Sequence, residues 1–370
     1  MKPYLTILLD SFRMLKARTI FWVTLGISLL VALIYLSIGF DEKGMSLFFG
    51  LSHFESDMFR RGTPQSETLY VAIFTKLIAE YWLSWIAVLL ALVSCAAIFP
   101  EALQEGASGV VLTKKLSRFQ VFVAKFVGSL LFVTLQVTLF VVIVFVALRW
   151  RVGSWNPSIF WYVPLILLVF TYLYSFMVVI AVKTKSVMTA LILTLVLWAV
   201  SSFVGFIEGQ IYSAIKMTER MEDSGKRMDV EARSAQTEEA EGEEALPSEE
   251  PEMKLEQEEY RSSSDANSMK TWHQRIVAAY ALFPKTGRTM EIADRLLVVN
   301  GEKGSSKGTF MTIMMGMEME EHDQGMSEEF VRVGEESADR HSKTYAIGTS
   351  VAFSVVMLAL SAWIFCRKEI

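Results

Sequence analysis

"VFVAKFVGSLLFVTLQVTLFVVIVFVAL", residues 121–148, is an apolar run in which Lys125 is the only charged residue. A helix rises about 1.5 Å per residue, so about 20 apolar residues cross the roughly 30 Å of a bilayer's hydrocarbon core. The run is long enough for a membrane-spanning helix. Lys125 lies near its start, where its long side chain is able to reach and anchor at the membrane surface.

Five further runs of this kind follow the same logic. Of the 370 residues, 52% are hydrophobic and 20% are charged, and the mean hydropathy is +0.38. This composition is typical of membrane proteins. We therefore predict an all-α membrane protein with six transmembrane helices, at about Thr19–Phe40, Tyr81–Phe99, Val121–Leu148, Phe160–Val182, Val187–Ile207 and Tyr345–Phe365.

Basic residues in the short connections predict the orientation. Cytoplasmic loops carry an excess of Lys and Arg, and strict alternation of six spans puts most of the basic clusters on one side. These are Lys2, Arg13, Lys16, Arg18, Lys114, Lys115, Arg118, Lys183, Lys185, Arg367 and Lys368, whereas Arg149 and Arg151 fall on the other side. Both termini are thus expected in the cytoplasm, with 41–80, 149–159 and 208–344 exported. We expect an integral, multi-pass protein of the bacterial inner (cytoplasmic) membrane.

The segment 1–18 has apolar residues at helical spacing, flanked by bases. This pattern favours an interfacial elbow helix on the cytoplasmic membrane surface, with Arg13, Lys16 and Arg18 as contacts to membrane lipid. A plain cytoplasmic extension of the first span is the alternative.

The exported region 208–344 is a large insertion between the fifth and sixth spans. Its acidic stretch predicts a disordered or loosely helical part at about 223–263. The periodicity after Trp272 predicts two short helices, with a break at Pro284 and Gly287. The last part, 345–370, is the sixth span with a short cytoplasmic tail.

Signals for catalysis and metal binding are weak. The Met-rich stretch 311–326 offers soft ligands for Cu(I), but Glu interrupts it and Met is a common residue in apolar packing, which is the favoured interpretation. Cys95 and Cys366 lie in or beside spans, so they belong to no exported disulfide framework. No span core carries a carboxylate, His or Arg, and we place Glu80 and Glu208 at span ends. We expect no enzyme activity, no metal and no nucleic-acid partner.

A polar insert, "FPEALQEGASGVVLTKKLSR" at 99–118, separates the second and third spans. Pro100 is able to begin a helix, and Glu101 suits the positive end of a helix dipole. An ordinary positive-inside loop explains the bases. A docking element for a cytoplasmic partner explains the whole order of residues better.

With the residues that follow it, up to Gly128, this insert resembles the loop between spans two and three of permease subunits in the ABC-2 family of ATP-binding-cassette transporters. In that family an acidic pair, a Gly, a basic element and a "gKxxg" element recur in this order. Ala107 and Lys115 stand where the family often has Thr and Pro. The matching residues are Glu101, Glu105, Gly106, Lys114, Ser117, Arg118, Lys125 and Gly128.

The resemblance implies a permease subunit of an exporter that pairs with a second permease copy or homologue. It also implies a separate cytoplasmic ATPase that holds ATP and Mg, because this chain has no Walker A motif. Residues 100–120 would form the coupling loop. In it Glu101 and Glu105 would pair with bases of the ATPase, and Gly106 would allow close helix approach or a sharp turn. Lys114 and Arg118, which flank Ser117, would bind anionic headgroups.

A different class of protein remains open on the residues alone. A membrane scaffold or anchoring protein would use the acidic external region to bind a partner and would transport nothing. The two hypotheses differ in whether an ATPase binds the cytoplasmic side.

Overall fold

The computed structural model describes residues 19–42, 44–55, 60–103, 117–239, 268–299, 302–303 and 341–367. Six helices in these ranges are long and apolar enough to cross a membrane, which confirms the predicted fold class. The strands in the described ranges form two small antiparallel sheets. The expected interfacial helix at 1–18 and the Met-rich stretch lie outside the described residues.

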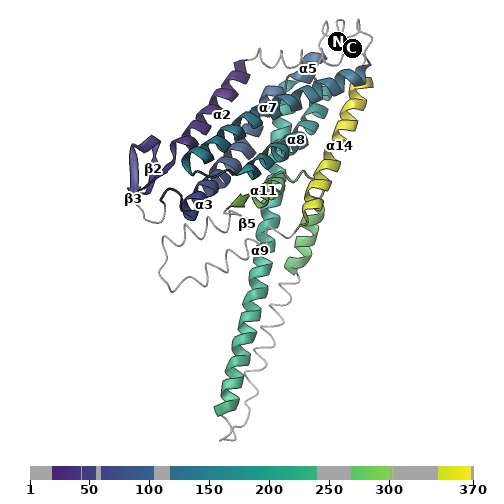
Figure 1. Cartoon of the computed structure of the whole chain (residues 1–370). Coiled ribbons are helices and arrows are strands. Elements are labelled where there is room, and N and C mark those ends of the chain that lie inside the picture. The colour runs from purple at the N-terminus through teal and green to yellow at the C-terminus, as the bar shows by residue number, and fades with distance from the viewer. Residues whose placement is uncertain are drawn as a thin grey trace.

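The spanning helices form one bundle, shown in Figure 1. The second helix is a composite run whose parts follow one another almost without interruption from Pro64 to Ala102. The elements are α2 (Thr19–Ser37), α3 (Pro64–Ile73), the π-helix η3 (Phe74–Ala87), α4 (Val88–Cys95), α5 (Ile98–Ala102), α7 (Arg118–Arg151), the 3₁₀ turn η4 (Pro157–Trp161), α8 (Tyr162–Thr184), α9 (Val187–Glu239) and α14 (Lys343–Arg367).

Helix α8 is the centre of the bundle. It packs against α14, α9, α7 and α4, and aromatic side chains such as Tyr162, Phe170 and Tyr174 are fully buried along it. In contrast, α2 and α9 expose large apolar side chains, among them Trp22, Leu30 and Phe203. Such a pattern suits peripheral helices that face lipid or a second chain.

The bundle has two distinct ends (Figure 1). The start of α2, α5 and the end of α14 lie at one end. At the other end lie α3 and a three-stranded sheet of β1 (Gly39–Asp41), β2 (Gly44–Leu47) and β3 (Ser52–Glu55), in which Phe40 pairs with Met45 and Met45 with Phe54. This arrangement agrees with the alternation that the basic residues predict.

The second spanning helix is longer than its apolar run. Thr63 caps it by accepting a hydrogen bond from the Ser66 amide at 3.3 Å, and Pro64 occupies the first turn. The helix therefore begins at Pro64 rather than near Tyr81. Its first part packs on α2, where Tyr70 and Phe74 contact Tyr35. Glu80 consequently lies inside this helix.

Glu208 likewise lies inside α9 and is fully buried. Glu80 and Glu208 thus lie within helices that continue beyond the apolar runs at whose ends the sequence placed them, and their position relative to the membrane stays a prediction. Helix α9 continues to Glu239, into the acidic stretch, and residues 240–267 lie outside the described part.

Two short helices follow, as the periodicity predicts: one over residues 268–280 and α11 (Thr286–Leu296). The break falls at 281–285, with Pro284 in it, whereas Gly287 lies inside α11. A two-stranded hairpin of β4 (Val298–Val299) and β5 (Glu302–Lys303) comes next.

Candidate functional site

The helix–turn–helix of 268–296 is held between two spanning helices. Ser201 of α9 donates a hydrogen bond to the Pro284 carbonyl oxygen at 2.6 Å. The Lys285 amide donates to Ser350 Oγ of α14 at 2.9 Å. Backbone groups of the turn are thus satisfied by hydroxyls of the spans, which a buried turn requires. The turn therefore bridges α9 and α14 at the end of the bundle that carries the sheet.

Glu208 is the hub of a buried polar cluster. Its Oε1 lies 3.3 Å from His273 Nε2 and 3.1 Å from His341 Nε2, and its Oε2 lies 3.4 Å from Arg288 Nη2. Arg288 also pairs with Glu291 at 2.6 Å. Glu208 of α9 and its three partners thus connect α9, the 268–280 helix, α11 and the segment just before α14. A buried carboxylate is costly without such partners. The cluster therefore stabilises the packing of these segments on one another.

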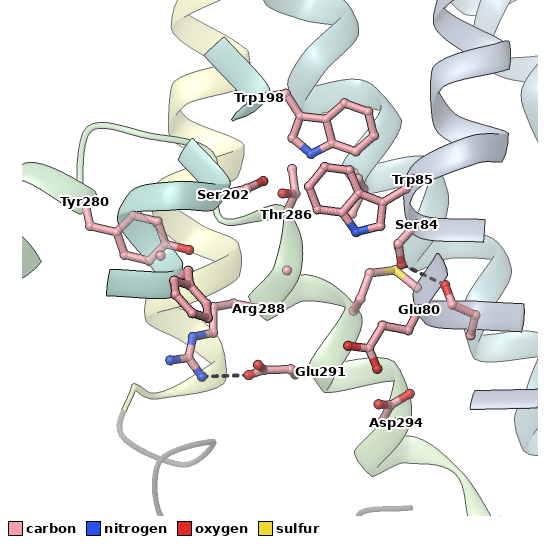
Figure 2. A pocket seen from close by; sticks show the side chains of 16 residues that line it. Glu80, Ser84, Trp85, Trp198, Ser202, Tyr280, Thr286, Arg288, Glu291 and Asp294 are labelled. Carbon is pink, nitrogen blue, oxygen red and sulfur yellow. Dashed lines mark hydrogen bonds and ion pairs between the residues drawn. The ribbon is translucent and has the colours of Figure 1, made fainter. Parts of the chain in front are cut away.

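A cavity of about 250 Å³ lies beside this cluster, between η3, α9 and α11 (Figure 2). Trp85 of η3 and Trp198 of α9 stack on each other, with ring centroids 4.7 Å apart, and form an apolar wall. Three carboxylates and one guanidinium complete the polar lining: Glu80, Glu291, Asp294 and Arg288. The cavity therefore combines an aromatic surface with charges of both signs.

The π-helical turn of η3 shapes one side of the cavity. Ser84 donates a hydrogen bond to the carbonyl oxygen of Ala79, five residues earlier, at 2.8 Å. Single π-helical stretches widen a helix and occur frequently at functional sites. Here the widened turn carries Glu80 and Trp85 to the cavity.

Asp294 links the cavity to the central helix. Tyr162 of α8 donates its hydroxyl to Asp294 Oδ1 at 2.5 Å, and both side chains are buried. A hydrogen bond to an ionised acceptor is about twice as strong as one between neutral groups. The contact fixes the orientation of α11 against α8.

Lys285 is buried at the start of α11. Its Nζ donates to Thr349 Oγ1 at 2.8 Å and lies 5.1 Å and 4.8 Å from the ring centroids of Tyr280 and Tyr345. Burial lowers the pKa of this ammonium from 10.5 to about 8, although the Glu208 carboxylate acts in the opposite direction.

This lowered pKa predicts a pH-dependent stability. Between about pH 8 and 10.5 the unfolded chain binds more protons at this position than the folded chain, so the free energy of unfolding rises with pH across that window. Below pH 8 both states are protonated and the contribution is constant. The thermal unfolding temperature of the detergent-solubilised protein should therefore rise with pH across that window, and Lys285→Met should remove this rise. The exposed Lys343→Met serves as control, and an unchanged rise in Lys285→Met would contradict the assignment.

The described residues of the predicted coupling loop, 100–103 and 117–120, lie at the opposite end of the bundle. Glu101 is half-buried in α5, which begins at Ile98 and not at Pro100. Ser117 caps α7: its Oγ accepts from the Gln120 amide at 3.3 Å, and the Gln120 side chain accepts from the Ser117 amide at 3.0 Å. Arg118 is the first residue of α7.

Lys125 is half-buried one to two turns further along α7. The remaining predicted residues lie outside the described ranges: Glu105, Gly106, Lys114, Arg13, Lys16 and Arg18. Of the sequence-predicted residues within the described ranges, none lines the cavity.

Sequence reasoning missed the whole polar cluster around Glu208. One signal was available: Arg288, Glu291 and Asp294 recur at a spacing of three, which puts them on neighbouring positions of one helix. The partner Glu208 is 80 residues away from Arg288 and gives no local signal. Among the described residues, no group of three His, Cys, Asp or Glu is arranged to hold a metal ion.

Comparison of the chain with models of known protein families, with characterised proteins and with solved structures gave no match. The six long apolar helices therefore define its class by themselves: the chain is an integral, multi-pass membrane protein.

Proposed function

We propose that this protein is the membrane subunit of an ABC-2 type, ATP-driven exporter. The observation that carries the proposal is the order of acidic, glycine and basic residues in the connection between α5 and α7, in a chain with six spanning helices. The chain itself carries no Walker A motif, so we assign ATP, Mg and hydrolysis to a separate cytoplasmic ATPase.

The helical run from Pro64 to Ala102 offers a path for coupling. Glu101 lies near one end of this run, and Glu80 and Trp85 line the cavity further along it. A push of the ATPase on α5 would therefore displace one wall of the cavity. Long helices transmit such displacements well because packed elements move as rigid bodies.

Aromatic packing connects α5 to the rest of the bundle. The Phe99 ring lies 5.2 Å from Phe122 of α7, 6.4 Å from Tyr174 of α8 and 6.2 Å from Phe365 of α14, measured between centroids. A movement of α5 would thus reach three other helices as well. These contacts support the role of α5 as a lever.

The cavity suits a place on the outward path of an amphipathic cargo. Its stacked indoles offer apolar contact, and its carboxylates and guanidinium offer charge pairing. We further propose that a second copy or homologue packs against the exposed apolar faces of α2 and α9, with membrane lipid on the remaining surface.

Co-purification with the candidate ATPase tests the proposal. The solubilised chain should retain the ATPase, and the double variant Glu101→Lys, Glu105→Lys should lose it, because charge reversal replaces attraction to basic residues by repulsion. The matched control is Glu42→Lys, Glu55→Lys, which makes the same change of charge at the opposite end of the bundle and should retain the ATPase.

Two results would contradict the proposal. If the loop variant binds the ATPase as well as wild type does, the docking assignment is wrong. If the wild-type chain binds no ATPase, the function as a transporter subunit fails, and the alternative of a membrane scaffold gains support.

A further inference from the structure

The turn that joins β2 to β3 exposes a cluster of large apolar side chains. Phe48, Phe49 and Leu51 of the turn are exposed to 59%, 60% and 87%, and Phe54 of β3 is exposed to 59%. In water, such side chains forfeit the favourable free energy of apolar burial. Contiguous exposed apolar side chains of this kind mark a surface that another phase or molecule covers.

The backbone of the turn is also strained. Phe48, Phe49 and Gly50 have φ angles of 51°, 58° and 98°. For an L-residue other than glycine, the left-handed region is unfavourable. The rings of Phe48 and Phe49 stay more than half exposed, so packing offsets little of this cost. Strain of this kind persists where the conformation serves a purpose that the rest of the structure enforces.

The turn lies at the level where two spanning helices end. Helix α2 ends at Ser37; β1 then leads away from the bundle, and β2 returns, so that Ser46 pairs with Gly39 directly after the helix. The turn at 48–51 is therefore back near the end of α2, and Figure 1 shows the sheet beside this end of the helix.

Arg151, the last residue of α7, fixes this level. Its Nε donates to the Leu36 carbonyl oxygen at 2.7 Å, and its guanidinium carbon lies 5.1 Å from the centre of the Phe49 ring. A guanidinium at this distance from an aromatic ring is attracted to it. The turn is thus tied to the ends of both α2 and α7.

Other aromatic side chains lie near the same ends of the spanning helices. Trp150, Trp155 and Trp161 are each more than half exposed, and the guanidinium carbon of Arg149 lies 5.3 Å from the centre of the Trp155 ring. Exposed Trp side chains beside the ends of spans are typical of the membrane–water interface, where Arg reaches the headgroups. The apolar turn continues this aromatic belt sideways.

Charge divides the sheet along its length. The end with Asp41, Glu42 and Glu55 is acidic and exposed, whereas the end with the turn is apolar. A soluble partner is free to bind either end, but a membrane accepts only the apolar one.

We propose that the 48–51 turn inserts its apolar side chains into the lipid leaflet at this end of the bundle. The leaflet surrounds the spans at the level where the turn lies, buries Phe48, Phe49 and Leu51, and leaves the acidic end in water, with Phe54 at the headgroup boundary beside Glu55. The sheet thereby acts as a lateral membrane anchor for α2, independently of any ATPase.

Site-specific fluorescence in lipid nanodiscs tests this insertion. In a background of Cys95→Ala and Cys366→Ser, an environment-sensitive dye is attached to Leu51→Cys or, separately, to Phe54→Cys, because neither exchange alters the left-handed residues. Leu30→Cys on the exposed face of α2 provides the lipid control, and Lys185→Cys in the exposed connection between α8 and α9 provides the water control.

We expect dye at positions 51 and 54 to be quenched by phosphatidylcholine carrying a nitroxide near the headgroup, more strongly than by lipid with a deep nitroxide. Iodide in the water should quench it several-fold less than dye at position 185. Quenching by iodide at the level of position 185 would overturn the proposal. Protection from both iodide and nitroxide lipids would overturn it too, because protein and not lipid would then cover the turn.

Discussion

Replacement of Glu208 by alanine is expected to destabilise the protein by about 3–5 kcal/mol, as found when one partner of a buried ion pair is removed. Arg288 would keep its contact with Glu291 at 2.6 Å but would lose the carboxylate 3.4 Å from its other nitrogen. His273 and His341 would lose their common acceptor. Thermal unfolding of the detergent-solubilised variant measures the effect.

A matched control lies on the same helix. Glu219 of α9 pairs with Lys216 and Lys270, but its side chain is partly exposed. Exposed pairs contribute only about 0–1 kcal/mol, so Glu219→Ala should leave the unfolding temperature nearly unchanged. Equal effects of Glu208→Ala and Glu219→Ala would refute the role of Glu208 as the hub of the cluster.

A double-mutant cycle separates the ion pair from the rest of the cluster. Glu208→Gln keeps the shape of the side chain, and Arg288→Met removes the guanidinium. Because each change alone leaves a buried group without its partner, the double variant should be more stable than the sum of the two single effects predicts. Additive effects would show that Glu208 and Arg288 do not interact across α9 and α11.

The spanning helices could be predicted because their signal is local and continuous. Each run of apolar residues is long enough to cross a bilayer on its own, and no distant contact is needed to recognise it. The ends of the helices were less predictable. The start at Pro64 was readable in principle from the Thr63-Pro64 pair, a capping residue followed by proline, but hydropathy alone placed the span near Tyr81.

The polar cluster around Glu208 could not be predicted, and the reason is physical. Arg288 and His341 lie 80 and 133 residues after Glu208 in the chain. In the sequence, each of the three therefore looks like an isolated surface charge. A buried charge is recognisable only when its partner is known. The predicted coupling loop shows the opposite case, since its residues are neighbours in sequence and their order alone suggests a partner.

Gly205→Val is expected to displace the 268–280 helix from α9. A Cβ atom at Gly205 would lie 2.7 Å from the Tyr280 hydroxyl oxygen and 3.0 Å from its ring carbon Cζ, closer than non-bonded atoms tolerate. Tyr280 is buried, so its ring has little room to move away. Overpacking of this kind typically costs about 1–3 kcal/mol. Thermal unfolding of the purified variant measures it.

Gly26→Val in α2 is the matched control, because nothing lies within 4 Å of a Cβ atom at that glycine. It places the same side chain in another spanning helix and should change stability by much less.

Rescue by a second change identifies the clash as the cause. Tyr280→Phe removes the oxygen that would lie 2.7 Å from the new Cβ atom, so Gly205→Ala should cost less stability when combined with Tyr280→Phe than alone. Gly205 and Tyr280 both line the cavity. A glycine at this position therefore lets Tyr280 approach α9 closely and form a wall of the cavity. If Tyr280→Phe leaves the cost of Gly205→Ala unchanged, the close approach of α9 to Tyr280 is not what requires glycine at position 205.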